Sequence, residues 1–278
     1  SQYAYLLELA INSDAEELGL ALIDLGIDVN QTSVDGGSLV NLIVTKKSMN
    51  NLFDRLLQKG ADVAAKNNKN DLAIVTALHH GDMVKSRKLL EKNCPIDFYS
   101  SQSGNQIHWI IEKGIVTEAI SLLSQFKVDI NGKDKNGDTP LIYAMKKTAT
   151  SYVHELLRLG AGVNLPNGKG VTALQYAIYQ NSQLLPDILA KCDNPNMPGI
   201  NGWTALHFAV REGNLDAVRK LLDAKANPLI ADNWGRTPYR IAREYGQEEI
   251  QKILRKKMGI SNVIKTSYAM NKKTHKAE

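Results

Sequence analysis

Apolar residues recur in short bursts separated by polar turns along most of the 278-residue chain. Two kinds of burst alternate, one rich in small residues and one with paired aliphatic residues, and each is about two or three helical turns long. The first kind is clearest in DKNGDTPLIYAMKK, NGKGVTALQYAIYQN, NGWTALHFAVREGN and DNWGRTPYRIAREYG, beginning at residues 134, 167, 201 and 232. The spacing of about 33 residues predicts stacked helix–turn–helix units.

The second kind of burst follows each of these segments and ends in a loop. Upstream, GLALIDLGIDVN, LFDRLLQKGADV, VKSRKLLEKNCPID and AISLLSQFKVDIN have the same form. No unit can cover its own apolar face, so stability must come from stacking on neighbours. We therefore predict a repeat array over 1–257 and a basic extension over 258–278, with repeats at approximately 1–32, 33–66, 67–99, 100–133, 134–166, 167–198, 199–231 and 232–257.

The ends of the first helices carry residues suited to them. A threonine stands where four of these helices begin, and its hydroxyl can accept a hydrogen bond from a first-turn N–H group: Thr139, Thr172, Thr204 and Thr237. Pro140 and Pro238 follow at the first helical position, where a missing N–H does no harm. Glycine suits the left-handed position after the helix, and it is found there at Gly81, Gly114, Gly213 and Gly246.

These motifs resemble the ankyrin repeat family. The resemblance is carried by TPL at 139–141, TALH at 204–207, RTPY at 236–239 and the GAD- and DVN-like loop endings. It covers roughly 1–257, and the motifs are strongest after residue 134. It implies an all-α ankyrin-repeat solenoid of about eight helix–turn–helix repeats, with short β-turn or hairpin fingers before each first helix. It also implies that fingers and first helices line a concave groove that binds a protein partner.

The family's contact positions can be transferred to matching residues of the last four repeats. Trp203 and Trp234 stand on fingers at places that the core does not require, and Trp, Tyr and Arg often dominate interface energy. The predicted partner-binding residues are Lys135, Asn136, Lys146, Lys147, Lys169, Tyr179, Gln180, Trp203, Arg211, Glu212, Trp234, Arg236 and Tyr245. The alternative for a finger tryptophan is packing against the adjacent finger.

The earlier repeats depart from the motif. The segments at 33–51, 67–82 and 101–114 lack the Thr-Pro pair, and Asn70 stands in a glycine place. We therefore expect irregular fingers within 31–107. The chain begins inside a first repeat, so we expect a fragment of a longer protein or an atypical N-terminal cap. Residues 258–264 could cover the other end of the stack.

Several residues with chemical potential have structural interpretations. His207 and His108 occupy the histidine place of the TPLH motif, where the imidazole bonds to neighbouring backbone. The aromatic row that follows this place is expected to lie in the core between layers: Trp109, Tyr143, Tyr176 and Phe208. His79 and His80 end a first helix and should face the groove, but no third ligand has metal-binding spacing.

The sequence contains neither the motifs of an enzyme nor the cysteine pattern of a secreted module. Cys94 and Cys192 stand alone in loops, which disfavours a disulfide framework or a multi-cysteine zinc site and favours a reducing, cytoplasmic setting. We find no phosphate-binding glycine motif and no catalytic constellation, so we expect no cofactor, no metal and no enzymatic activity. No apolar run reaches the length of a membrane span.

The net charge of +5 belongs to the C-terminal end. Eight basic residues follow position 251, which leaves 26 basic and 28 acidic side chains before it. This placement disfavours a nucleic-acid-binding face on the repeats. Binding of nucleic acid or an acidic membrane through the tail is therefore the lowest-ranked interpretation.

The leading hypothesis is a monomeric, non-enzymatic protein-interaction module. The composition, rich in Asn, Lys and Ile, indicates an AT-rich genome. For an array of that composition the resemblance to the ankyrin family implies, as the favoured setting, a bacterial effector with a virulence role, secreted into the cytosol of a host cell. The alternative is that the array is the targeting or substrate-recognition part of a larger enzyme whose catalytic segment lies outside this chain.

Overall fold

The computed structural model describes residues 5–34, 36–96, 104–180 and 183–259. The chain divides into two compact units, residues 1–135 and 136–278, each of which is described separately. The described residues form helices and connecting turns, with two isolated β-bridges, as the motifs predict. The extension beyond residue 259, and with it most of the segment expected to cover the end of the stack, lies outside the described residues.

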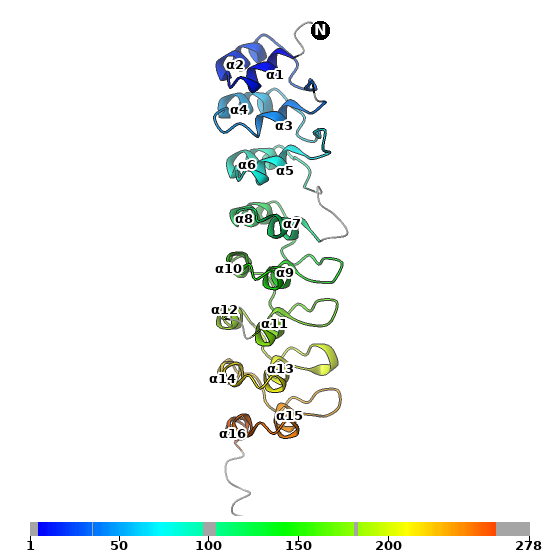
Figure 1. Ribbon diagram of the computed structural model, residues 1–278, viewed down its shortest axis with the longest axis vertical. Helices are drawn as coiled ribbons and strands as arrows, with labels where there is room; N and C mark the ends of the chain where they lie inside the picture. Colours follow the sequence, from blue (N-terminus) through cyan, green and yellow to red (C-terminus); the bar gives the residue numbers. More distant parts are fainter. Residues whose placement is uncertain (1–4, 35, 97–103, 181–182, 260–278) are drawn as a thin grey trace, which may run out of the picture. The chain divides into compact units, whose positions relative to one another are not determined.

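The first unit consists of four helix pairs joined by turns (Figure 1). The pairs are α1 (Leu6–Asn12) with α2 (Glu16–Asp24), α3 (Leu39–Ile43) with α4 (Asn50–Gln58), α5 (Ala73–His79) with α6 (Met83–Glu91), and α7 (Gln106–Lys113) with α8 (Glu118–Gln125). Along the stack, α1 contacts α3 and α3 contacts α5 in the layer of first helices. In the layer of second helices, α2 contacts α4 and α6 contacts α8.

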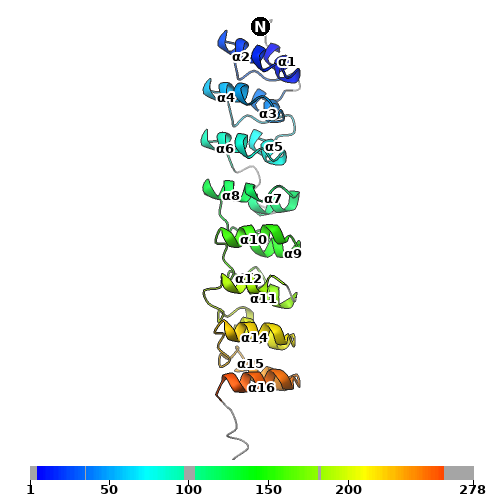
Figure 2. The ribbon, with the colours of Figure 1, turned by 90° about the vertical axis from the view of Figure 1, so that its left-hand side faces the viewer.

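The second unit repeats this arrangement with four further pairs. They are α9 (Pro140–Lys146) with α10 (Thr150–Arg158), α11 (Ala173–Tyr179) with α12 (Leu185–Ala190), α13 (Ala205–Arg211) with α14 (Leu215–Asp223), and α15 (Pro238–Glu244) with α16 (Glu248–Lys257). In Figure 2 the second helices of this unit face the viewer. Each first helix contacts the next first helix, and each second helix contacts the next second helix.

The ends of the first helices follow the predicted chemistry. The hydroxyls of Thr139, Thr172 and Thr237 each accept a hydrogen bond from the backbone N–H three residues later, which satisfies one unpaired donor of the first turn. The four predicted glycines all adopt positive φ after their helices. Between α9 and α10 this place is taken by Thr148, with φ of 54°, a conformation that costs a β-branched residue energy.

The core lies between the two helix layers and between neighbouring pairs. Small residues Ala144, Ala177, Ala209 and Ala242 are fully buried on the first helices, so that neighbouring backbones approach closely. The predicted aromatic core row is only half confirmed. Trp109 and Phe208 are buried, whereas Tyr143 and Tyr176 are partly exposed.

The expectation of irregular fingers in 31–107 is wrong for the two fingers that the structure describes there. The turns close through hydrogen bonds from Ser33 N–H to the Gly37 carbonyl and from Asn67 N–H to the Asp71 carbonyl, at 2.7 and 2.9 Å. Asn70 adopts φ of 66°, so it supplies the left-handed conformation that glycine supplies elsewhere. The following finger includes residues 97–103, which lie outside the described ranges.

Within the described ranges, none of the helices combines the length and the apolar character that crossing a bilayer requires.

Candidate functional site

Two pairs of neighbouring fingers in the second unit are joined through their backbones. Gly168 N–H donates to the Asn136 carbonyl at 2.9 Å, and Asn233 N–H donates to the Asn201 carbonyl at 3.0 Å. A Cβ atom on Gly137 would lie 2.3 Å from Gly168 N, so glycine is required where these two fingers meet. The two fingers of each of these pairs are therefore held at a fixed spacing, and Figure 1 shows the fingers projecting on the side of the first helices.

In three of the described fingers a single side chain organises the turn from within, and the sequence motifs did not reveal it. The Oδ1 atom of Asn167 accepts hydrogen bonds from the N–H groups two and four residues later, at 2.9 and 3.0 Å. Asp232 does the same at 2.9 and 2.8 Å, and Asn67 does so in the first unit. An Asn or Asp three residues before a left-handed residue is the signal that could have revealed these anchors.

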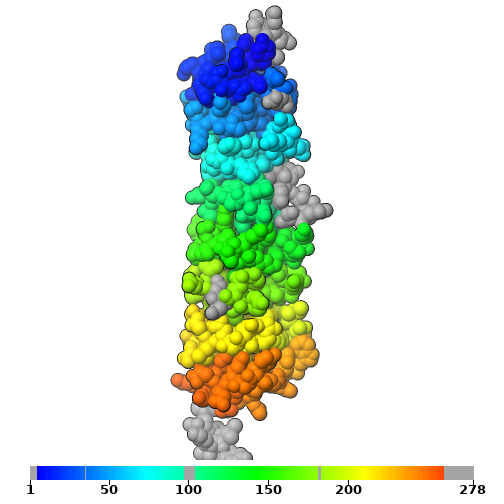
Figure 3. All heavy atoms as spheres, viewed as in Figure 1, coloured from blue at the N-terminus to red at the C-terminus, as the bar shows by residue number. Residues whose placement is uncertain are grey.

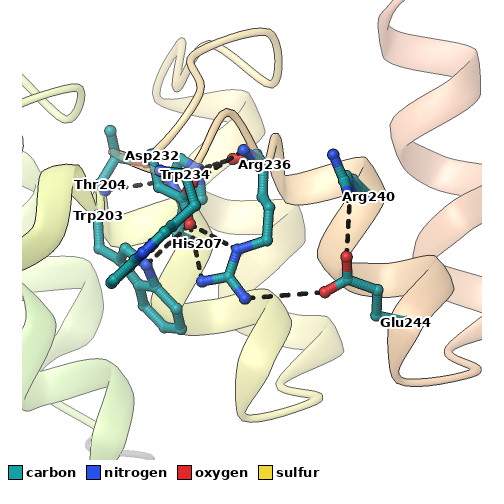
Figure 4. A network of polar contacts seen from close by, with 8 residues as sticks. All are labelled: Trp203, Thr204, His207, Asp232, Trp234, Arg236, Arg240 and Glu244. Carbon is teal, nitrogen blue, oxygen red and sulfur yellow. Dashed lines mark hydrogen bonds and ion pairs between the residues drawn. The ribbon is translucent and has the colours of Figure 1, made fainter.

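The second oxygen of Asp232 places it at the centre of a polar network (Figure 4). Oδ2 accepts hydrogen bonds from Arg236 Nε at 2.9 Å and from Trp203 Nε1 at 3.2 Å. Arg236 also lies 3.8 Å from Glu244 Oε2 through Nη1, and Glu244 accepts from Arg240 Nε at 3.1 Å. The network connects the last two fingers with the end of α15.

Protonation within this network is set by burial and hydrogen bonding. Burial would raise the pKa of Asp232, but the backbone N–H donors and the Arg236 guanidinium outweigh it and hold that pKa below its usual range. Burial lowers the pKa of His207, whose Nε2 lies 3.1 Å from the Arg236 carbonyl. Since that carbonyl can only accept, Nε2 carries the proton, and Nδ1 accepts from Thr204 N–H at 3.1 Å. The structural interpretation of His207 is confirmed.

The indole of Trp203 packs against the next finger, which is the alternative that the sequence left open for a finger tryptophan. It is half-buried, its Nε1–H donates to Asp232 of the next finger, and its ring lies in edge contact with Phe208 at 5.1 Å. The partner Asp232 is 29 residues away along the chain, so the motif around Trp203 does not identify it.

Trp234 differs from Trp203 because it is 58% exposed. Its backbone N–H is fixed by Asp232, and the Arg236 guanidinium lies 5.0 Å from its ring centre. Tyr179 and Tyr245, at the ends of α11 and α15, are 65% and 58% exposed. These three aromatic side chains, together with Ile200 at 49% exposure on the finger at 199–203, are large apolar groups that the second unit leaves open to solvent on this side.

Except for Lys135, the remaining predicted contact residues lie on the fingers and first helices of the second unit. Lys146 forms a 2.5 Å ion pair with the buried Asp138, Lys147 lies over the Tyr143 ring, and Arg211 is bonded to Glu212. Lys135 is the exposed last residue of the first unit. The finger surface is defined here as Asn136, Lys146, Lys147, Lys169, Tyr179, Gln180, Trp203, Arg211, Glu212, Trp234, Arg236 and Tyr245. In Figure 3 the second unit runs from green to orange.

The first unit contains a hollow of about 510 Å³ that the sequence analysis did not identify. It lies between the finger turns that contain Ser33 and Asn67 and helices α3 and α5, and its lining includes Asn41, Asp71, His79 and His80. The two histidines therefore face the finger side, as expected. Burial and the Lys113 ammonium lower the pKa of His79, whose ring also meets Trp109 edge-on at 5.2 Å.

Neither cysteine has the properties of a thiol nucleophile. Burial raises the pKa of Cys94 to about 11, and its Sγ–H donates to the Val63 carbonyl at 3.2 Å. Burial also raises the pKa of Cys192, whose side chain is half-buried. A thiol with a raised pKa is protonated at neutral pH and reacts slowly. The described ranges contain no group of three or more His, Cys, Asp or Glu residues placed to hold a metal ion.

Stacked helix pairs with projecting, mutually bonded finger turns define this chain as a repeat scaffold. The family model for ankyrin repeats in three copies matches residues 107–196 and 182–266, more than half of the chain. The chain belongs to the ankyrin repeat family. Ankyrin repeats generally mediate protein–protein interactions, and the family is typically non-catalytic.

The match to this chain covers very different shares of the similar proteins. The chain is 35% identical to cyclin-dependent kinase inhibitor 2A from Monodelphis domestica over 116 residues, covering 41% of this chain and 68% of that protein. It is 32% identical to an ankyrin repeat protein of fowlpox virus, over 61% of this chain and 52% of that protein. It is 28% identical to an L-asparaginase from Dirofilaria immitis, over 63% of this chain but only 30% of that protein.

Proposed function

We propose that this chain is a non-enzymatic interaction module that binds a protein partner through the finger surface of its second unit and the groove beside it. The observation that carries the proposal is the exposure of Trp234, Tyr179 and Tyr245 on fingers and helix ends that are otherwise rigidly bonded. Large aromatic groups held at a fixed spacing lose little entropy on binding, so they are effective contact residues.

A co-purification experiment with matched variants tests this proposal. Immobilised protein is used to recover partners from a cell lysate, and Trp234→Ala is compared with Arg219→Ala. Arg219 is 56% exposed on α14, in the layer of second helices, so it serves as the control. We expect Trp234→Ala to reduce recovery of the specific partner by about tenfold or more, while Arg219→Ala leaves it unchanged. Equal recovery by both variants contradicts the proposal.

An alternative function is supported by one of the relatives. The L-asparaginase of Dirofilaria immitis is named as an enzyme, and the chain matches only 30% of its length. On this alternative the array is the recognition part of a larger enzyme. Activity of the product of the complete gene, absent from the isolated array, would favour it over a free-standing module.

We also propose that the chain is a monomer in the cytoplasm, and that its setting is a bacterial effector with a virulence role in a host cell. The effector setting is supported only by a composition rich in Asn, Lys and Ile. Light scattering that gives a dimer mass contradicts the first part. A reporter fusion that never reaches the host cytosol during infection contradicts the second.

A further inference from the structure

Two arginines and two tryptophans of the finger surface alternate in one stacked series. The Arg236 guanidinium carbon lies 5.0 Å from the centre of the Trp234 ring and 5.9 Å from that of Trp203. The Arg211 guanidinium carbon also lies 5.2 Å from the centre of the Trp203 ring. Rings at these distances attract a cation and restrict its motion. Both guanidiniums are therefore held in place before any partner arrives.

Carboxylates of the same chain accept hydrogen bonds from only some of the N–H donors of these two arginines. Arg236 directs Nε and Nη2 to Asp232, and its Nη1 is 3.8 Å from Glu244, too far for a good hydrogen bond. Arg211 directs Nε and Nη2 to a single oxygen of Glu212. Among the residues that the structure describes, none accepts a hydrogen bond from Nη1 of Arg211. Planar guanidinium donors of this kind match a carboxylate.

The solvent-facing side chains around this series include more cations than carboxylates. Asp138 and Asp232 are buried, so they neutralise their partners from within and present little negative charge to solvent. The carboxylates left at the surface near the series are Glu212 and Glu244, both already paired with arginine. The cations on the same fingers and helix ends are more numerous: Lys146, Lys147, Lys169, Arg211, Arg236 and Arg240.

We infer that the finger surface selects an acidic protein segment, in which carboxylates meet Arg211 and Arg236 while apolar side chains contact Trp234 and the exposed tyrosines. This inference rests on the proposed function, and it specifies the chemistry of the partner. Glu212 and Glu244 stand between the cations, where they would repel a continuous phosphate backbone. An acidic segment with separated carboxylates fits that arrangement better than a nucleic acid does.

Selection from a display library of short random peptides tests the inference, because it requires no candidate partner. We expect the recovered peptides to be enriched in Asp and Glu together with apolar residues. Their affinity should fall with rising ionic strength and by about tenfold in Arg211→Met, which keeps an apolar side chain over Trp203 but removes the charge. Arg219→Met removes an exposed charge from α14 and should leave affinity unchanged. Circular dichroism of both variants excludes loss of the fold as the cause.

The outcomes separate this inference from the proposed function. Recovered peptides without an excess of acidic residues, or acidic peptides that bind Arg211→Met as well as the wild type, overturn the inference and leave an interaction module intact. Failure to recover any peptide overturns the inference, whereas the interaction module is contradicted by equal recovery of the lysate partner by Trp234→Ala and Arg219→Ala. An oligothymidylate probe that binds more tightly than the acidic peptides and loses affinity in Arg211→Met overturns the inference in favour of nucleic acid.

Discussion

At the scale of single residues, the position of His207 shows how one hydrogen-bonding role can be filled by different side chains. In the preceding repeat, Gln175 occupies the same place, accepting from Thr172 N–H at 3.0 Å and donating to the Trp203 carbonyl at 3.1 Å. His207 makes the equivalent pair of bonds to Thr204 and Arg236. Both side chains tie a helix start to the next finger, but only histidine titrates near neutral pH.

This equivalence predicts a specific pH effect. Since burial lowers the pKa of His207 in the folded protein, the unfolded chain binds a proton more readily below its own histidine pKa of about 6.5. The free energy of unfolding should therefore decrease as pH falls below that value. In His207→Gln the decrease should be smaller, because glutamine keeps both bonds without titrating, while His79 still contributes. Denaturant unfolding at several pH values measures this.

The exposed His80 provides the matched control for that experiment, because His80→Gln removes an imidazole that does not connect neighbouring repeats. Its free energy of unfolding at neutral pH should stay close to that of the wild type, which controls for the loss of an imidazole as such. If His207→Gln keeps the full pH dependence of the wild type, protonation of His207 is not linked to folding.

At the scale of helices, α6 has a lysine in its buried face. Lys85 is 1% exposed and occupies the place that Leu52 fills in α4 and Ala217 fills in α14. Its Nζ donates to the Lys46 carbonyl at 2.5 Å and lies 3.1 Å from Asp82 Oδ2. The neighbouring Ser86 hydroxyl is buried without a hydrogen-bond partner among the described residues. The α5–α6 pair therefore packs with a polar interior.

We expect Lys85→Met to stabilise the protein, because desolvating an ammonium group costs more than its bonds return in many buried pairs. The free energy of unfolding should increase by about 1–2 kcal/mol. Asp82 is 23% exposed, so its carboxylate stays solvated after the substitution. Chemical denaturation measures the change, with the exposed Lys92→Met as a control that should have little effect. A loss of stability in Lys85→Met shows that the ammonium contacts are net stabilising.

Helix boundaries were largely predictable from the sequence, whereas contacts between repeats were not. Thr139, Thr172 and Thr237 act within three residues of themselves, so local motifs revealed their roles. Trp203 and Asp232 are 29 residues apart, and nothing in either segment alone indicates that they meet. Lys85 was missed for the opposite reason, because a lysine on a predicted helix is ordinarily solvated. Local hydrogen-bonding rules thus predict the single repeats, while the side-chain contacts between neighbouring repeats can be identified only from the structure.

At the scale of the whole molecule, stability in each unit depends on contacts between adjacent helix pairs. In the second unit, α10 contacts α9 and α12, and α14 contacts α12, α13 and α16. No element contacts the whole unit, as in other stacked repeats. A local defect should therefore weaken the nearest pairs most, and the effect should decline along the stack.

Leu156→Ala tests this distribution, because Leu156 is fully buried in α10 between the helix layers. Deleting its side chain should cost about 2–5 kcal/mol through lost contacts and the cavity left behind. Hydrogen exchange followed by mass spectrometry should then show faster exchange in α9–α12 than in α15–α16, relative to the wild type. The exposed Arg158→Ala in the same helix should change neither region. Equally faster hydrogen exchange across α9–α16 contradicts a nearest-neighbour stack and indicates that the second unit unfolds as one cooperative block. In that case a partner bound at Trp234 would stabilise α9 as strongly as α15.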